Sequence, residues 1–256
     1  MNNEKITFSL VQYPSVKGDI QKNLINHLEN IKLSADYGAD VVIFPELSLT
    51  GYELEIASQL AIDGTSSIIS ELSQAAIDNH VVIVSGAPLI SGSDKPYIGA
   101  FISYPSGKTD FYRKQYLHAG EDNFVSAGSE NYCFEIKGKK LFLGICADFT
   151  CSQHWLDANS AQADIYLSSV LISQNGFEHD SKILKQKAIE HNLNIVMTNY
   201  IGETGGWFSN GNSRVWDSNG NVCISANDAD PCLVLCAISN DNISGRIINI
   251  TKNFTR

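Results

Sequence analysis

Apolar residues recur along the first half of the chain with spacings that alternate between those of strands and helices. Residues 6–11, 41–44 and 81–84 are short apolar runs. The last two lack any polar alternation, which is typical of strands buried on both faces. Between the runs, apolar residues return every three or four positions after Asp19 and again after Thr65. This period predicts two helices, with Asp19 and Thr65 as their N-caps.

The rest of the chain has more closely paired strands. Two hairpins are predicted, one around the Pro105-Ser106-Gly107-Lys108 turn and one around Gly138. The elements that follow are expected at 164–167 (strand), 178–191 (helix), 194–198 (strand), 217–220 (hairpin turn) and 233–238 (strand). No linker rich in Pro, Gly or Ser divides the chain. We therefore expect one α+β domain over 1–240, with sheets covered by helices, and an ordered tail over 241–256.

Composition and charge narrow the class of protein. The chain has 256 residues, 43% of them hydrophobic, and a formal net charge of −10, which a nucleic-acid phosphate backbone would repel. Its apolar runs are too short to span a bilayer, and its N-terminus does not resemble a secretion signal. We therefore expect a cytoplasmic protein that binds neither nucleic acid nor membrane. Its six cysteines are expected to be free thiols, and since they form no CxxC pair, no metal site is indicated.

Three residues with reactive side chains lie where predicted strands end. Glu46 follows the run at 41–44, Lys114 follows the first hairpin, and Cys146 follows the apolar strand of the second hairpin. A carboxylate at the rim of a core is partly desolvated and suits a general base, and a thiol at a strand-to-helix turn suits a nucleophile. Each residue alone has an ordinary alternative: a surface glutamate, a solvated lysine or an inert buried cysteine.

The order and flanking residues of the three segments resemble those of the nitrilase superfamily, also called carbon–nitrogen hydrolases. Phe44-Pro45-Glu46 is followed by Thr50-Gly51-Tyr52, Tyr112-Arg113-Lys114 matches the lysine motif, and Gly144-Ile145-Cys146-Ala147-Asp148 matches the cysteine motif. The similarity covers roughly residues 5 to 238. It implies a nitrilase-like fold, a four-layer α-β-β-α sandwich.

The resemblance also implies roles for these residues. Glu46 would take the proton of Cys146, Cys146 would attack an amide carbonyl carbon to form a thioester, and Lys114 would stabilise the oxyanion. Glu121 matches a second family glutamate that positions substrate and lysine. The resemblance implies no cofactor and no metal, with a small-molecule amide as the partner. It further implies a homodimer that pairs through helices near the cysteine segment, where His154-Trp155-Leu156 offers apolar surface, with the tail's isoleucines adding more.

Departures from the family pattern fall where its members line their pockets. Ser152 and Gln153 replace a common Pro-Glu pair, and Ile98-Gly99 stands in place of a common asparagine. The candidate substrate-binding residues are Tyr52, Ala147, His154 and Trp207. His154 has the alternative of a surface or capping histidine, and Trp207 that of packing against a sheet. Cys151 is either a resolving thiol for Cys146 or an ordinary packed or exposed cysteine.

Taken together, the residues and the resemblance predict an amidase-type hydrolase of non-peptide carbon–nitrogen bonds. The expected substrate is a small amide or carbamoyl compound, cleaved through a cysteine thioester by a Glu-Lys-Cys triad. Two alternatives stay open: a glutaminase-type module that supplies ammonia or an acyl group, and a catalytically silent protein of the same fold.

Overall fold

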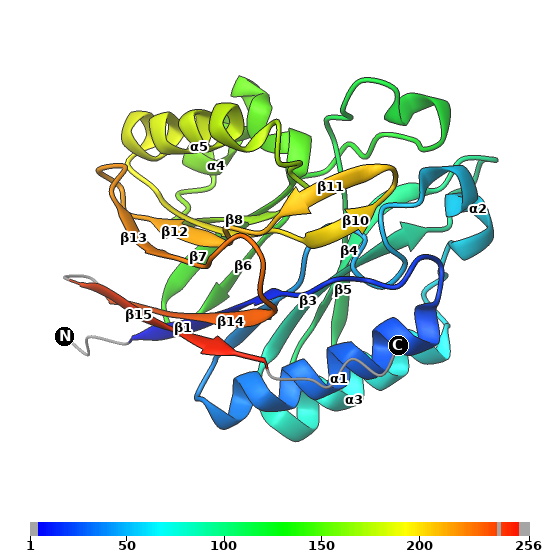
Figure 1. The fold of residues 1–256 in the computed structure, drawn as a ribbon, viewed down its shortest axis with the longest axis horizontal. Coiled ribbons are helices and arrows are strands. Elements are labelled where there is room, and N and C mark those ends of the chain that lie inside the picture. The colour runs from blue at the N-terminus through cyan, green and yellow to red at the C-terminus, as the bar shows by residue number, and fades with distance from the viewer. Residues whose placement is uncertain (1–4, 240–241, 251–256) are drawn as a thin grey trace.

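Two β-sheets face each other in the computed structural model, which describes residues 5–239 and 242–250 (Figure 1). The larger sheet has seven strands in the order β15 (Ile243–Asn249), β14 (Cys232–Ile238), β1 (Ile6–Gln12), β2 (Val41–Ile43), β3 (Val82–Leu89), β4 (Tyr97–Ser103), β5 (Thr109–Arg113). The smaller has six strands in the order β13 (Val222–Ser225), β12 (Arg214–Trp216), β9 (Asn194–Thr198), β8 (Ile165–Ser169), β7 (Lys139–Ile145), β6 (Cys133–Ile136). A separate hairpin joins β10 (Ile201–Thr204) and β11 (Trp207–Asn210).

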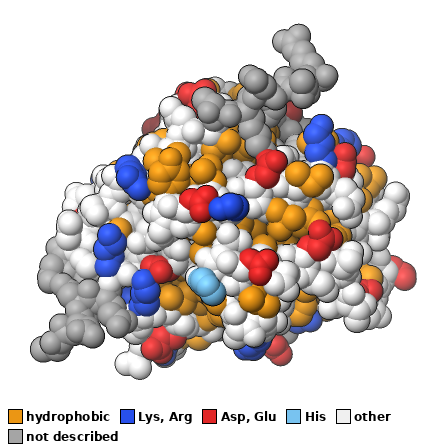
Figure 2. Space-filling view, turned by 90° about the horizontal axis from the view of Figure 1, so that it is seen from below, with side chains coloured by type: hydrophobic (Ala, Val, Ile, Leu, Met, Phe, Trp, Pro, Cys, Tyr) orange, Lys and Arg blue, Asp and Glu red, His pale blue; other side chains and the backbone are white. Residues whose placement is uncertain are grey.

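Helices cover the outer face of each sheet. In Figure 1, α1 (Ile20–Asp36) and α3 (Ser67–Asn79) lie below the larger sheet, and α4 (Ser152–Ser160) and α5 (Phe177–His191) lie above the smaller one. Figure 2 looks onto the α1–α3 side, where acidic and basic side chains are interspersed with apolar ones. Four shorter elements lie in the connections: η1 (Leu54–Ile56), α2 (Ala57–Leu60), η2 (Glu121–Asn123) and η3 (Cys146–Thr150). The four-layer α-β-β-α sandwich expected from the sequence is confirmed.

Three apolar clusters separate the layers. Phe8, Ile43 and Leu143 are among the residues buried between the two sheets. A second cluster lies under α1 and α3, and a third, built around Trp155, lies under α4 and α5. Strand β7 contributes to two of these clusters. Leu141, Leu143 and Ile145 belong to the cluster between the sheets, while Phe142 belongs to the third. Successive side chains on a strand point to opposite faces, so a strand packed on both sides is apolar throughout.

The local predictions are largely confirmed. Asp19 caps α1 by accepting a hydrogen bond from the Lys22 N–H, and both hairpins form where their turns were expected. The predicted cap of α3 is wrong by one residue. Ser66 is the N-cap, because Thr65 is held in the preceding turn by two hydrogen bonds to Oδ1 of Asp63. The α4 helix and the β10–β11 hairpin were not predicted from the sequence.

The C-terminal segment is an edge strand of the larger sheet. Strand β15 pairs antiparallel with β14 along seven residues. The predicted tail at 241–256 therefore contributes a strand within its described part, whereas residues 241 and 251–256 lie outside the described residues. None of the six cysteines, all of which lie in the described ranges, forms a disulfide.

Candidate active site

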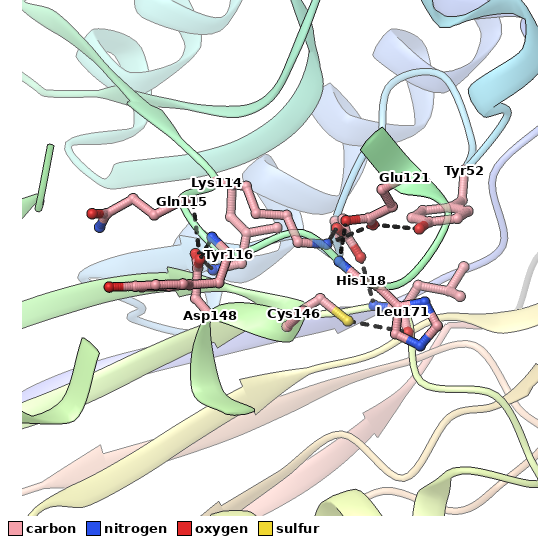
Figure 3. Close-up of polar contacts among 12 residues, drawn as sticks. Tyr52, Lys114, Gln115, Tyr116, His118, Glu121, Cys146, Asp148 and Leu171 are labelled. Atoms are coloured by element: carbon pink, nitrogen blue, oxygen red, sulfur yellow. Dashed lines mark hydrogen bonds and ion pairs between the residues drawn. The ribbon is translucent and has the colours of Figure 1, made fainter. Parts of the chain in front are cut away.

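The three candidate catalytic residues lie at the ends of strands from both sheets. Glu46 follows β2 and Lys114 directly follows β5, both in the larger sheet. Cys146 directly follows β7 in the smaller sheet and opens η3. Because the two sheets face each other, the strand ends bring these side chains together between the layers. Glu46 and Lys114 are fully buried, and Cys146 is partly exposed. Figure 3 shows Lys114, Glu121 and Cys146 with their polar contacts.

The ammonium of Lys114 lies between two carboxylates. Its Nζ is 2.7 Å from Oε1 of Glu46 and 2.7 Å from Oε1 of Glu121. The same oxygen of Glu121 accepts a hydrogen bond from the Tyr52 hydroxyl, and the other oxygen accepts one from the His118 N–H. Glu121 is thus fixed by three donors and shares the ammonium of Lys114 with Glu46. The structure therefore brings four of the predicted residues into one connected group.

Cys146 is presented by a strained turn. Its φ is 43°, in the left-handed region that a non-glycine residue seldom adopts. Its thiol donates to the Leu171 carbonyl at 3.4 Å, and the Leu171 N–H donates to Oε2 of Glu46 at 3.2 Å. The backbone of Leu171 thus contacts both the thiol and the Glu46 carboxylate. Sequence reasoning missed Leu171, although its position just after β8, the parallel neighbour of β7, is a usable signal.

Burial and charge set the protonation states in this group. Desolvation raises the pKa of Glu46 to about 7, the Lys114 charge opposes this rise, and the Glu121 charge adds to it. Desolvation also raises the pKa of the Cys146 thiol well above its ordinary value, and the Glu46 charge raises it further. Burial alone would lower the pKa of Lys114, but its carboxylate neighbours outweigh it and raise that pKa. Near neutral pH the site thus holds a thiol, an ammonium and a carboxylate able to take a proton.

Asp148 connects the lysine segment to the cysteine turn. Its Oδ1 accepts hydrogen bonds from the backbone N–H groups of Gln115 and Tyr116, at 3.0 and 2.9 Å. Its Oδ2 accepts from the Ile145 N–H at 2.8 Å and from the Tyr112 hydroxyl at 2.7 Å. Asp148 is fully buried, so this one carboxylate fixes the backbone next to Lys114 relative to the backbone next to Cys146.

Residues 7–243 match the carbon–nitrogen hydrolase family. The chain belongs to this family. It is 28% identical over 202 residues to the 2-oxoglutaramate amidase of Bacillus subtilis (strain 168), a match that covers 77% of each chain. This carbon–nitrogen hydrolase thus has the enzyme class that the sequence predicted.

Solved structures of low sequence identity share the fold. An amidase variant from Nesterenkonia sp. AN1, in complex with acrylamide, superposes with a TM-score of 0.86 at 20% identity and covers 94% of each chain. A glutamine-dependent NAD+ synthetase from Acinetobacter baumannii has a TM-score of 0.85 at 21% identity. That match covers 97% of this chain and 48% of the synthetase, so this chain spans about half of that protein.

The four candidate substrate-binding residues have different environments in the hydrolase. Tyr52 and Trp207 line a pocket of about 470 Å³ that reaches Glu121. Ala147 is buried next to Cys146. His154 is fully buried in the layer under α4, where it hydrogen-bonds to the hydroxyls of Tyr112 and Tyr166, and it does not line the pocket. The structure therefore brings Tyr52 and Trp207 to the pocket but not His154.

Two further observations concern the described part of the chain. Within it, no group of three or more His, Cys, Asp or Glu side chains is placed to hold a metal ion. None of its helices is both long and apolar enough to cross a membrane.

Proposed function

We propose that this hydrolase cleaves small amides through a thioester on Cys146. The observation that carries the proposal is the connected group of Lys114, Glu46 and Glu121, which the backbone of Leu171 links to the Cys146 thiol. Such a group supplies a nucleophile, a base and a cation at one point. The amidase among its sequence relatives supports an amide as substrate.

The first half of the reaction forms the acyl-enzyme. Glu46 accepts the thiol proton while the Cys146 sulfur forms a bond to the carbonyl carbon, and Lys114 stabilises the negative charge that develops on the oxygen. The carbon–nitrogen bond then breaks, and the proton held by Glu46 passes to the leaving nitrogen. A primary amide thus releases ammonia and leaves a thioester.

The second half releases the acid. Glu46 takes a proton from water, the resulting oxygen nucleophile attacks the thioester carbonyl, and the carbon–sulfur bond breaks as the thiol regains a proton. Glu121 contacts Lys114 throughout and keeps its ammonium directed at the site. Neither half needs an oxidant, a reductant or a metal ion to balance.

Ammonia release from a panel of small primary amides and carbamoyl compounds tests the proposal, with Cys146→Ala as the inactive control. We expect release that is matched mole for mole by acid product and abolished in Cys146→Ala. Turnover confined to glutamine would favour the glutaminase-type alternative. Absence of turnover on every compound, with no acylation of Cys146 by a reactive ester, would favour a catalytically silent protein.

We also propose a cytoplasmic homodimer that pairs through α4 and α5. His154 and Trp155 are fully buried and offer no surface, whereas Leu156 on α4 and Ile189 on α5 are 52% and 46% exposed. The two helices are in contact, since the Trp155 and His191 rings stack. A light-scattering mass of two chains at micromolar concentration, reduced to one chain by Leu156→Glu, is the expected result. A mass of one chain for the unmodified protein would contradict it.

A further inference from the structure

The pocket that reaches Glu121 has an excess of negative charge. Its lining includes the carboxylates of Glu53, Glu55 and Glu121, whereas the ammonium of Lys17 is the only lysine or arginine charge among the lining residues, all of which lie in the described ranges. The negative charge of Glu121 is paired with the ammonium of Lys114, which is not among the lining residues. The outer part of the pocket therefore carries two carboxylates against one ammonium.

The ammonium of Lys17 is already paired. Its Nζ lies 3.0 Å from Oε2 of Glu53. The other oxygen of Glu53 accepts hydrogen bonds from the Gly205 N–H at 2.9 Å and from the Thr204 hydroxyl at 3.4 Å. Glu53 is nearly buried and tied to the β10–β11 hairpin, so its carboxylate is fixed in place, whereas the paired Lys17 side chain is exposed. A carboxylate on a ligand in the outer pocket would lie near the negative charges of Glu53 and Glu55. The ammonium of Lys17 is already paired with Glu53.

Aromatic side chains complete the outer pocket. Trp207 and Phe124 both line it and are 48% and 36% exposed. The face of an indole or phenyl ring attracts cations, and the attraction is strongest when the cation is partly desolvated. Carboxylates next to exposed rings form the kind of environment that holds an ammonium group.

We propose that the preferred substrate is a small amide with an ammonium group at the end remote from the amide. The amide would face Cys146, and the ammonium would lie in the outer pocket near Glu55 and the two aromatic rings. This inference rests on the proposed function, because it takes the amide to be the cleaved group.

Three amides of matching chain length provide the test: 5-aminopentanamide, hexanamide and 4-carbamoylbutanoate, which end in an ammonium, a methyl group and a carboxylate. We expect kcat/KM to fall in that order, with at least about tenfold between the first and the last, as expected for one favourable against one unfavourable charge contact. The same order is expected for binding to Cys146→Ala, measured by calorimetry. Equal or tighter binding of the carboxylate compound, or no binding of the ammonium compound, overturns the inference.

The binding measurement separates this inference from the proposed function. Binding of the ammonium compound to Cys146→Ala, without turnover of any amide by the unmodified enzyme, would overturn the proposed function and leave the charge preference standing. Turnover with the reverse order would overturn the charge preference alone.

Substitutions that remove a charge from the pocket test whether the ammonium group binds there. Glu55→Gln should lower the ratio of kcat/KM for the ammonium compound over the carboxylate compound by about three- to tenfold, and Lys17→Met should raise it. Glu71→Gln, on α3 and outside the pocket lining, makes the same change in net charge and should leave the ratio unchanged. An equal effect of Glu55→Gln and Glu71→Gln would overturn the assignment of the ammonium to this pocket.

Discussion

Glu46 and Lys114 form an ion pair of 2.7 Å in which neither side chain is exposed. Lys114 makes a second contact of the same length with Glu121, so one cation serves two buried carboxylates. The group therefore has one negative charge in excess, away from water. Desolvation together with this excess charge explains why the pKa of Glu46 rises to about 7 while the pKa of Lys114 also rises.

The raised pKa of Glu46 predicts an acid limb in the pH dependence of hydrolysis. Only the deprotonated carboxylate accepts the thiol proton, so kcat/KM should rise about tenfold per pH unit below about 7 and level off above it. Initial rates between pH 5 and 8.5 measure this limb. Glu46→Gln, which keeps the shape but removes the base, should lose the limb along with most of the activity. A limb centred near 4.5 would show that Glu46 is not the base.

Replacing Lys114 with methionine should affect both rate and stability. Loss of one oxyanion donor typically costs about 10²–10³ in kcat. Without the cation the pKa of Glu46 should rise further, and a carboxyl group with a raised pKa stabilises the fold at acid pH and loses that contribution as the pH rises through its folded pKa. The loss in Tm relative to the unmodified protein should therefore be larger at pH 8 than at pH 5.

Lys182→Met is the matched control for this prediction. Lys182 forms an exposed ion pair with Glu178 on α5, so its removal should change rate and Tm little at either pH. An equal loss of Tm at both pH values in Lys114→Met would contradict the charge argument.

Cys146 should carry the covalent intermediate. Its thiol lies on a strained turn and shares the Leu171 backbone with the Glu46 base, whereas Cys151 lies five residues on, at the end of η3. Intact-protein mass spectrometry after a reactive ester is added should show one acyl group, mapped to Cys146 by peptide digestion. Cys151→Ala should give the same adduct at the same rate. An adduct on Cys151, or activity in Cys146→Ala, would overturn the assignment.

Asp148→Asn should lower activity although the hydrogen bonds of Asp148 go to residues next to Cys146 and Lys114 in the chain. Both carboxylate oxygens accept from backbone N–H groups, so an amide nitrogen in either place would face a donor. We expect kcat to fall about 10- to 100-fold with little change in KM, and the acylation rate of Cys146 to fall in parallel. Asp78→Asn, at an exposed position on α3, is the control and should behave as the unmodified enzyme. Loss of Tm with unchanged kcat would assign Asp148 a purely structural role.

Much of the architecture could be predicted from local sequence because its causes are local. The unbroken apolar run at 41–44 indicates a strand buried on both faces, and Asp19 before a helical repeat indicates a cap. Glu46, Lys114 and Cys146 were found because each follows a predicted strand and because their flanking motifs resemble one family. The α4 helix was missed, since its buried side consists of His154, Trp155 and Ala158, too short a repeat to stand out.

The sequence by itself determined which residue types stand at the strand ends and therefore which chemistry is available. Only the tertiary structure decided that Lys114 lies between Glu46 and Glu121, that Leu171 contacts both Glu46 and Cys146, and that His154 is buried away from the pocket. The physical reason is that most of these contacts join residues far apart in the sequence: Lys114 is 68 positions from Glu46, after another strand of the same sheet, and Leu171 reaches Glu46 from the other sheet. They depend on how strands pair and sheets stack, whereas strand periods and caps depend only on residues a few positions apart.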